Sequence, residues 1–372
     1  MEELGEAELR ELGAHKIQKA YRGVYFNADH ETLYRVNYCS RFFSRFLAPI
    51  VEFKCVGTDQ IYTKALGIAW ERVLNVDGTF AVVANVANSR ITHSQFAAFR
   101  LKDGVADYFR GTRGKRPSVD TRNPAVWLNL HVENDRATIS IDTSGGALHR
   151  RGYRTEGGEA PLQETLAAAI IAFSDWDGER PLYDPMCGSG TILGEAVMRY
   201  RRIPPGYLRA RFGFENLPDF NPEVWANVKK AGNENIRELP EGLIAGSDRD
   251  PKAVRIACSN LERLPGGDRV RLSRKEFSRI DHIHNSTIVT NPPYGLRMGD
   301  PRLAGQLIKA FGDFLKNRCT GSTAYVYLGD RALIPELGLH TSFKKQLFNG
   351  PLDGRLVKLE LYAGKRGSDD KR

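Results

Sequence analysis

The chain has 372 residues, 41% hydrophobic and 27% charged, which is the composition of a soluble globular protein with room for about two or three domains. Its net charge of +9 and pI near 9.3 favour a polyanionic partner. Five scattered cysteines without a CxxC pair argue against a zinc site or a disulfide framework. No apolar run is long enough to cross a bilayer, so we expect a cytoplasmic protein without a membrane partner.

The first half of the chain mixes helical and extended patterns, which indicates an α+β region. Residues 126–132 alternate apolar and polar side chains, and residues 137–141 would form their hairpin partner. We see no reaction site in this half. The other elements expected here are a helix over 3–12, an extended segment over 23–26, a helix from Leu33, a strand over 81–86 and a helix over 92–109.

A basic, glycine-rich stretch over residues 149–158 separates the two halves. It can be a solvated linker. Alternatively, Arg150 and Arg151 beside Tyr153 suit a phosphate backbone and the face of a base. The sequence leaves both interpretations open.

From Pro161 onward strands and helices alternate, which is typical of a doubly wound α/β sheet. A final hairpin would add an antiparallel strand to a parallel sheet, and we expect the residues after Gly364 to be disordered. Residues 201–241 form an insertion whose aromatic residues we expect to pack on the sheet. The expected elements are a helix over 162–173, strands at 181–183, 242–246, 270–273, 286–290 and 323–328, and hairpin strands over 342–348 and 355–362.

Residues 184–191, Asp-Pro-Met-Cys-Gly-Ser-Gly-Thr, follow the first of these strands and lead into a helix. Gly188 and Gly190 allow the backbone to approach a ligand closely. The spacing is not that of dinucleotide binders. Because Asp184 opens the loop, it suits a ligand with a cationic amine, such as the methionine moiety of S-adenosylmethionine, rather than a phosphate.

Two acidic residues follow the next strands. Asp248 comes directly after its strand and can bind both hydroxyls of a ribose, whereas Asp250 is as suited to cap the next helix. Glu276 follows the third strand, where a polar side chain can contact an adenine amine beside an apolar neighbour.

Asn291-Pro292-Pro293-Tyr294 follows the apolar strand at 286–290. An exocyclic amine of a nucleobase is a poor nucleophile because its lone pair is delocalised. The Asn291 side-chain carbonyl and a backbone carbonyl at Pro292 can accept hydrogen bonds from that amine and stabilise the transition state for methylation. Tyr294 would stack on a flipped base. Cys187 has no partner motif for cytosine C5 methylation, so we interpret its side chain as packing.

Taken together, residues 184–191, 291–295 and 349–353 resemble the THUMP-domain RNA guanine-N2 methyltransferases, as does the junction around 151–162. The resemblance is nearest to the N-terminal half of the bacterial large-subunit ribosomal RNA enzyme and covers nearly the whole chain. It implies a ferredoxin-like piece over 1–49, an RNA-binding THUMP domain over 50–145 and a linker over 146–160. A class I, Rossmann-like methyltransferase domain over 161–364 and a disordered tail over 365–372 would follow.

The resemblance also implies roles for residues and a substrate. Asn291, Pro292 and Tyr294 would hold a guanine of ribosomal RNA, or of transfer RNA as the alternative, next to S-adenosylmethionine, and no metal is expected. The expected cofactor contacts are Asp184, Met186, Cys187, Gly188, Gly190, Thr191, Asp248, Glu276 and Asn291. The expected RNA contacts are Arg113, Lys115, Arg116, Arg150 and Arg151.

Three departures from the family pattern are visible. Relative to the family pattern we expect the chain to start late, after the strand that usually precedes the first helix. Glu276 stands where the family typically has aspartate, and the sequence ends at residue 372, before the second methyltransferase domain that some bacterial relatives carry. The same Asn-Pro-Pro-Tyr also serves adenine N6, cytosine N4 and the glutamine of release factors. A non-catalytic RNA-binding or ribosome-assembly factor remains a further alternative, and the oligomeric state is unknown.

Overall fold

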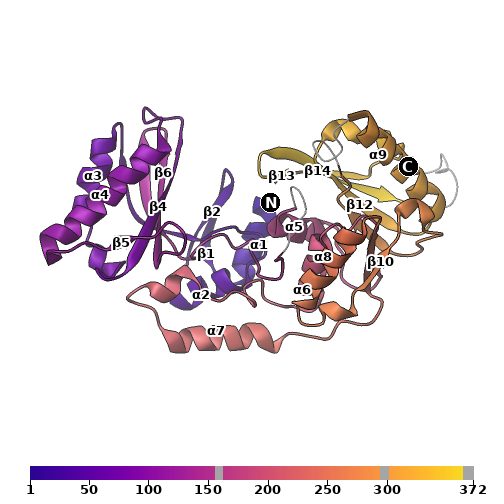
Figure 1. The fold of residues 1–372 in the computed structure, drawn as a ribbon, viewed down its shortest axis with the longest axis horizontal. Coiled ribbons are helices and arrows are strands. Elements are labelled where there is room, and N and C mark those ends of the chain that lie inside the picture. The colour runs from indigo at the N-terminus through magenta and orange to yellow at the C-terminus, as the bar shows by residue number, and fades with distance from the viewer. Residues whose placement is uncertain (156–161, 294–300, 363–372) are drawn as a thin grey trace. The chain divides into compact units, whose positions relative to one another are not determined.

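The computed structural model describes residues 1–155, 162–293 and 301–362. The chain forms two compact units, and each is discontinuous in sequence (Figure 1). The first unit comprises Met1–Asn27, His149–Leu208 and Gly232–Arg372. The second comprises Ala28–Leu148 and Arg209–Ala231. No helix among the described residues combines the length and apolarity that a bilayer crossing requires.

The first unit is built on a seven-stranded sheet with the order β10-β9-β8-β11-β12-β14-β13. Its first five strands are parallel, whereas β14 is antiparallel to both neighbours, which confirms the doubly wound sheet with a C-terminal hairpin. The strands are β8 (Leu182–Asp184), β9 (Ile244–Asp248), β10 (Arg271–Arg274), β11 (Thr287–Thr290), β12 (Thr323–Leu328), β13 (Phe343–Asn349) and β14 (Leu352–Glu360).

Helices cover both faces of this sheet because successive strand residues point to opposite sides. Val289 packs in the core with α5 (Glu164–Phe173) and α6 (Thr191–Tyr200), whereas its neighbour Ile288 packs with α9 (Pro301–Arg318). The helix α8 (Pro251–Glu262) contacts α6 and the strands β9 and β10. The first unit also contains α1 (Glu2–Glu11) and the antiparallel hairpin of β1 (His15–Ala20) and β2 (Gly23–Asn27).

The second unit has a five-stranded sheet with the order β3-β7-β6-β4-β5. The hairpin of β6 and β7 forms as predicted, and its turn residues Asn134 and Asp135 have φ of 51° and 57°, as a tight hairpin turn requires. The elements are α2 (His30–Cys39), β3 (Leu47–Lys54), α3 (Thr58–Leu66), β4 (Thr79–Ala87), α4 (Ser94–Arg113), β5 (Ser118–Val119), β6 (Val126–Glu133) and β7 (Arg136–Asp142).

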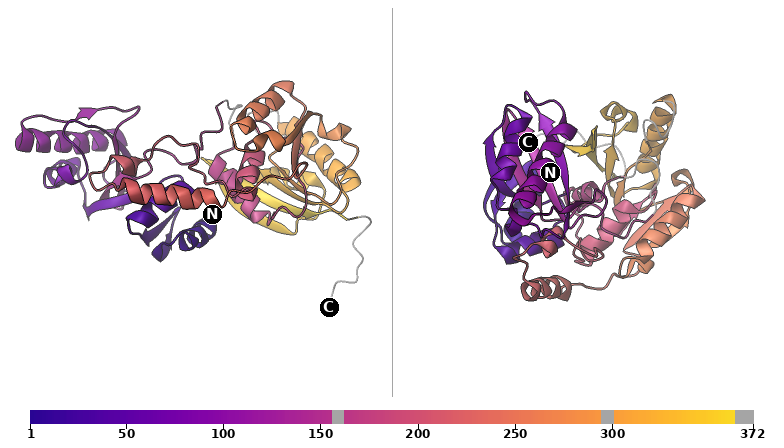
Figure 2. Two further views of the ribbon diagram at one scale, coloured as in Figure 1. Left: turned by 90° about the horizontal axis from the view of Figure 1, so that it is seen from below. Right: turned by 60° about the vertical axis from the view of Figure 1, so that its left-hand side comes forward.

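The aromatic residues of the insertion correct one expectation. Phe212, Phe214 and Trp225 do not pack on the seven-stranded sheet. Phe214 stacks on Tyr34 of α2 with ring centroids 4.4 Å apart, and Trp225 contacts Tyr38 edge-on at 5.3 Å. Segment Arg209–Ala231, which includes most of α7 (Pro222–Glu234), therefore belongs to the second unit although residues of the first unit flank it in sequence (Figure 2).

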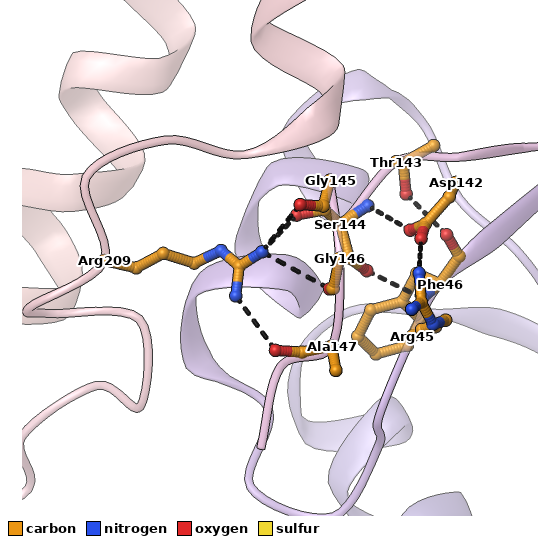
Figure 3. Close-up of polar contacts among 9 residues, drawn as sticks. All are labelled: Arg45, Phe46, Asp142, Thr143, Ser144, Gly145, Gly146, Ala147 and Arg209. Carbon is orange, nitrogen blue, oxygen red and sulfur yellow. Dashed lines mark hydrogen bonds and ion pairs between the residues drawn. The ribbon is translucent and has the colours of Figure 1, made fainter. Parts of the chain in front are cut away.

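Arg209 fixes the start of this segment to the end of the five-stranded sheet (Figure 3). Its guanidinium donates to the carbonyl oxygens of Ser144, Gly145, Gly146 and Ala147 at 3.0, 3.1, 3.3 and 3.1 Å. In the same region Asp142 accepts from Arg45 and from the backbone N–H of Ser144. One arginine thus supplies donors to four successive carbonyl groups after β7.

Candidate active site

A cavity of about 530 Å³ lies at the carboxyl ends of β8, β9, β10 and β11. This is the edge at which open α/β sheets bind ligands, and the volume suits a small organic molecule. The cavity brings together Gly188, Asp248, Glu276 and Asn291 from four separate loops. The lining residues are Leu162, Pro185, Met186, Gly188, Ser189, Thr191, Ile192, Asp248, Arg249, Asp250, Lys252, Ala253, Ile256, Glu276, Phe277, Asn291, Pro293 and Leu307.

The glycine loop between β8 and α6 forms one wall. Gly188 has φ of 53°, and a Cβ there would meet no atom within 4 Å, so its backbone faces open space. Gly190 has φ of 80° and packs on α8, where a Cβ would lie 3.1 Å from that of Ala257. Asn260 of α8 donates through Nδ2 to the carbonyl oxygen of Ser189 at 3.0 Å. The loop is therefore held open toward the cavity by contacts with α8 behind it.

Asp248 at the end of β9 connects two loops. Its Oδ2 accepts from the backbone N–H of Gly188 at 2.9 Å, and its Oδ1 accepts from that of Asp250 at 2.9 Å. A carboxylate has about four lone-pair positions, so each oxygen can accept a further donor from a ligand. Asp250 caps α8 by accepting from the N–H of Lys252 at 2.8 Å, the role expected for it.

Asp184 lies behind the cavity and is not among its lining residues. It is 1% exposed, and its Oδ1 accepts from Thr290 Oγ1 at 2.7 Å and from the N–H of Met186 at 3.1 Å. Burial raises the pKa of Asp184 to about 7, against the lowering effect of these two bonds. Because Thr290 directly precedes Asn291, the carboxyl group joins the glycine loop to the strand that carries the asparagine.

Asn291 stands at the end of β11 on the cavity wall. Its Oδ1 is buried and has no hydrogen-bond partner among the described residues. A buried acceptor without a partner costs about 1–3 kcal/mol, so this oxygen suits a ligand donor such as an N–H. Pro293 lines the cavity and Pro292 is buried outside it. Tyr294 lies outside the described residues.

Cys187 packs in the core that the sheet shares with α6. Its side chain is 6% exposed, and burial raises the pKa of the thiol well above its usual range. Since a thiolate is the reactive form, this environment disfavours a cysteine nucleophile. Met186 and Thr191, by contrast, line the cavity.

Several lining residues were missed in the sequence. Lys252, Ala253 and Ile256 lie on one face of α8, and Leu307 comes from α9. The spacing of 252, 253 and 256 is that of one helix face and could have identified them. Nothing in the local sequence points to Leu307.

The five basic residues expected to bind RNA divide into two groups. Arg113, Lys115, Arg116 and Arg150 are exposed. Arg113 lies 3.8 Å from Glu71, and Lys115 pairs with Asp77. Arg151 requires a correction, because its side chain is 1% exposed and its Nε lies 3.5 Å from the buried Glu195. It is not placed to contact a phosphate backbone.

The surroundings of Arg151 explain this burial. Tyr153, which was expected to offer a face to a base, is fully buried and donates to Glu195 Oε1 at 3.1 Å. Arg154 pairs with Glu164 of α5 at 3.2 Å, and burial raises the pKa of Glu164 to about 7. The side chains of Arg151 and Tyr153 are therefore part of the first unit's interior, and that of Arg154 is half-buried, whereas Gly152 is exposed.

The seven-stranded sheet with its antiparallel hairpin and the cavity at its carboxyl edge define a class I methyltransferase, the class that uses S-adenosylmethionine. The chain belongs to the RMKL-like methyltransferase family, whose domain model matches residues 151–358. A THUMP domain model matches residues 57–142, and the RlmL ferredoxin-like domain matches residues 1–47.

Named relatives agree with this membership. The Synechocystis protein "Putative RNA methyltransferase slr0064" is 35% identical and aligns over 97% of this chain and 94% of its own length. The ribosomal RNA large subunit methyltransferase K/L of Syntrophotalea carbinolica is 39% identical over 95% of this chain. The chain spans about half the length of that relative, 51%. The crystal structure of SMU.472 complexed with SAH matches 98% of this chain and 96% of its own, with a TM-score of 0.86 and 27% identity.

Proposed function

We propose that the protein transfers a methyl group from S-adenosylmethionine to the exocyclic N2 amine of a guanine in structured RNA, with 23S ribosomal RNA as the first candidate. The observation that carries this proposal is the buried Oδ1 of Asn291, which has no hydrogen-bond partner in the described part of the chain and lies on the wall of a cavity that also contains Asp248 and Gly188. An acceptor without a partner beside a nucleoside-sized site suits an N–H donor that is present only when substrate binds.

The residues of the cavity fit the cofactor. S-adenosylmethionine supplies an electrophilic methyl group on a sulfonium centre. The free lone pairs of Asp248 would accept from the ribose hydroxyls, while Glu276 and Phe277 would contact the adenine. The open backbone at Gly188 would allow close approach of the methionine part, and Asp184 would balance its cationic amine from behind the loop. SAH in the related SMU.472 structure supports this assignment.

Asn291 would act on the target amine. Its Oδ1, with the backbone carbonyl of Pro292, would accept hydrogen bonds from the NH2 group and favour the rehybridised nitrogen that attacks the methyl group. Proximity and alignment would supply much of the remaining acceleration. The proton can leave after transfer, so the residues need not include a strong base. Transfer would be direct, since the buried Cys187 offers no accessible nucleophile.

The RNA substrate is supported by three observations that do not depend on the cavity. The chain has a net charge of +9, it matches a THUMP domain model, and its relatives include a ribosomal RNA methyltransferase. Exposed Arg113, Lys115, Arg116 and Arg150 are proposed to contact phosphates. A ribosomal RNA substrate would also place the protein in the cytoplasm.

Nucleoside mass spectrometry of ribosomal and transfer RNA from cells lacking the protein tests this proposal. We expect N2-methylguanosine to be lost from 23S ribosomal RNA and restored by the wild-type gene. Loss from transfer RNA instead would change the substrate to the alternative. Loss of a methylated adenosine or cytidine would contradict the assignment of the amine, as would loss of methylglutamine from a release factor in peptide mass spectrometry of the same cells. Unchanged methylation together with no calorimetric binding of S-adenosylmethionine would favour a non-catalytic RNA-binding factor.

A further inference from the structure

The hairpin of β1 and β2 exposes aromatic side chains that no core explains. Tyr21 at its tip is 87% exposed, and Tyr25 is 68% exposed. Phe348 of β13, in the same unit, is 41% exposed. Exposed aromatic side chains in one region commonly mark an interaction site.

Arg22 connects the hairpin to β13. Its Cζ lies 5.5 Å from the ring centroid of Tyr21 and 5.0 Å from that of Phe348. Tyr21, Arg22 and Phe348 therefore form one continuous group of planar side chains, named here the aromatic platform. Arginine guanidinium groups and aromatic rings both stack on nucleobases.

The backbone of Arg22 forms part of the tight turn between β1 and β2. Its φ is 55°, in the left-handed region that costs a residue with a Cβ roughly 1 kcal/mol or more. Glycine would occupy this turn position without that cost, and Gly23 is the next residue. This φ belongs to the tight turn between Ala20 and Gly23, which fixes the Arg22 side chain at the tip of the hairpin beside Tyr21.

The positive charge of Arg22 also favours one kind of ligand for the aromatic platform. Nearby Lys345 pairs with Glu3 at 2.8 Å, and Arg355 pairs with Asp353. Arg22, in contrast, is exposed and makes no ion pair within the described part of the chain, and neither does exposed Lys344 on β13. The Glu2 carboxylate lies against the backbone N–H of Arg22 and pairs with the N-terminal amine at 3.0 Å. The Arg22 guanidinium between two aromatic rings suits a polyanion with planar bases.

The sheet topology places the platform at the same edge as Asn291. The turn between β13 and β14 follows Asn349, and Arg355 of β14 pairs with Leu328 at the carboxyl end of β12. That end lies beside the carboxyl end of β11, where Asn291 follows. Three strand spacings separate β11 from β13, which is roughly 14 Å. A separation of this size suits nucleotides that lie close to the target base in the same RNA strand.

We propose that the aromatic platform binds unpaired RNA nucleotides that flank the target nucleotide, with bases stacked on Tyr21 and Phe348 and a phosphate contacted by Arg22. This proposal rests on the proposed function for the identity of the substrate. It adds a binding surface outside the cavity and outside the THUMP domain.

Fluorescence anisotropy with the full-length protein tests the platform. The probes are a fluorescein-labelled single-stranded RNA of mixed sequence, about ten nucleotides long, and an RNA duplex of the same length. Tyr21→Ala removes one stacking face. Arg22→Gly removes the guanidinium and relieves the turn, since glycine accepts this φ freely. Tyr362→Ala is the matched control, because Tyr362 is 45% exposed and follows β14 at the opposite edge of the sheet.

We expect Tyr21→Ala to weaken single-strand binding about 10-fold and to change duplex binding little. Arg22→Gly should reduce the slope of log affinity against log salt concentration by about 0.7, the value for one phosphate contact in a single strand. Tyr362→Ala should bind like the wild type. Single-strand binding by Tyr21→Ala equal to that of Tyr362→Ala would overturn the proposal, as would an equal loss on the duplex.

Methyl transfer to ribosomal RNA, measured in parallel, separates this proposal from the proposed function. With an active wild type, we expect Tyr21→Ala to raise the KM for RNA and to leave kcat nearly unchanged. A wild type that methylates no RNA but loses single-strand affinity on Tyr21→Ala would refute the proposed function and support the platform.

Discussion

Asp248 accepts one backbone N–H on each of its two carboxylate oxygens. Asparagine at this position would have to turn its NH2 group toward one of these two donors, so even an isosteric substitution disturbs the loop. We therefore predict that Asp248→Asn weakens S-adenosylmethionine binding at least about 10-fold, the loss of one charge-assisted hydrogen bond. Isothermal titration calorimetry measures this, with the exposed Asp281→Asn as control. Equal affinities of the two variants would contradict the role of Asp248.

Asp184 predicts a pH dependence of stability. Its pKa is about 7 in the folded protein against 3.8 in the unfolded chain. Because the folded-state pKa is raised, the stability that the protonated carboxyl group of Asp184 contributes is fully present below about pH 4 and is lost as the pH rises through 7. Asp184→Asn cannot ionise but can still accept from Thr290 and Met186.

Between pH 5 and the folded-state pKa of Asp184 near 7, about two pH units, the wild type loses stability and Asp184→Asn does not. The unfolding free energy of the variant relative to the wild type should therefore rise by about 3 kcal/mol between pH 5 and pH 8. Urea unfolding at the two pH values gives this difference. Glu164, which also has a pKa near 7, is present in both proteins and cancels. An identical pH dependence of variant and wild type would show that Asp184 does not titrate in this range.

Motif chemistry at the level of single residues predicted six residues that the structure places around one cavity: Met186, Gly188, Thr191, Asp248, Glu276 and Asn291. Each follows a strand, and the carboxyl ends of parallel strands meet at one edge. Arg151 was misassigned because a basic, glycine-rich stretch does not reveal its partner. That partner, Glu195, is 44 positions further along the chain on a buried helix face.

At the scale of elements, periodicity predicted β12 and the hairpin of β6 and β7 closely. The hairpin strands expected over 342–348 and 355–362 leave a turn over 349–354. This turn is shorter in the structure, because Asn349 and Leu352 pair across it. Asparagine, glycine, proline and aspartate all favour turns, so composition alone extended the turn into the strands. Strand β3 received no bounds of its own from the sequence, and Pro49 interrupts its pattern.

The segment that begins at Arg209 gives a prediction at this scale. Arg209→Ala removes the donors from four carbonyl groups and should lower the unfolding free energy by about 2 kcal/mol. Arg211→Ala is the matched control, since Arg211 is exposed and donates to Asn123 alone among the described side chains. Thermal unfolding followed by circular dichroism compares them. Equal transition temperatures would show that the carbonyl contacts of Arg209 contribute no stability.

At the scale of the whole molecule, the alternation of strands and helices after Pro161 was sufficient to predict the doubly wound sheet. The surface on which the aromatic residues of the insertion (201–241) pack could not be predicted in this way. Phe212, Phe214 and Trp225 are typical core residues in any context, and their contacts with Tyr34 and Tyr38 span more than 170 positions in sequence. Local patterns indicate that such residues are buried but not which surface they cover.

The discontinuous second unit predicts the behaviour of fragments. A fragment of residues 28–148 leaves Tyr34 and Tyr38 uncovered, although both are at most 3% exposed in the complete chain. We expect this fragment to lack cooperative thermal unfolding and to recover it when residues 209–231 are fused through a flexible linker. Circular dichroism at increasing temperature distinguishes the two proteins. Cooperative unfolding of the shorter fragment at the same temperature would contradict the structural role of the insertion.

The central claim is that the carbonyl oxygen of Asn291 accepts a hydrogen bond from the amine that is methylated. The most direct measurement is the single-turnover rate of methyl transfer from labelled S-adenosylmethionine to 23S ribosomal RNA by wild type and Asn291→Ala, with cofactor affinity measured by calorimetry. We predict cofactor affinities within about threefold of each other and a rate at least about 10-fold lower in the variant. A variant rate equal to that of the wild type would contradict the claim.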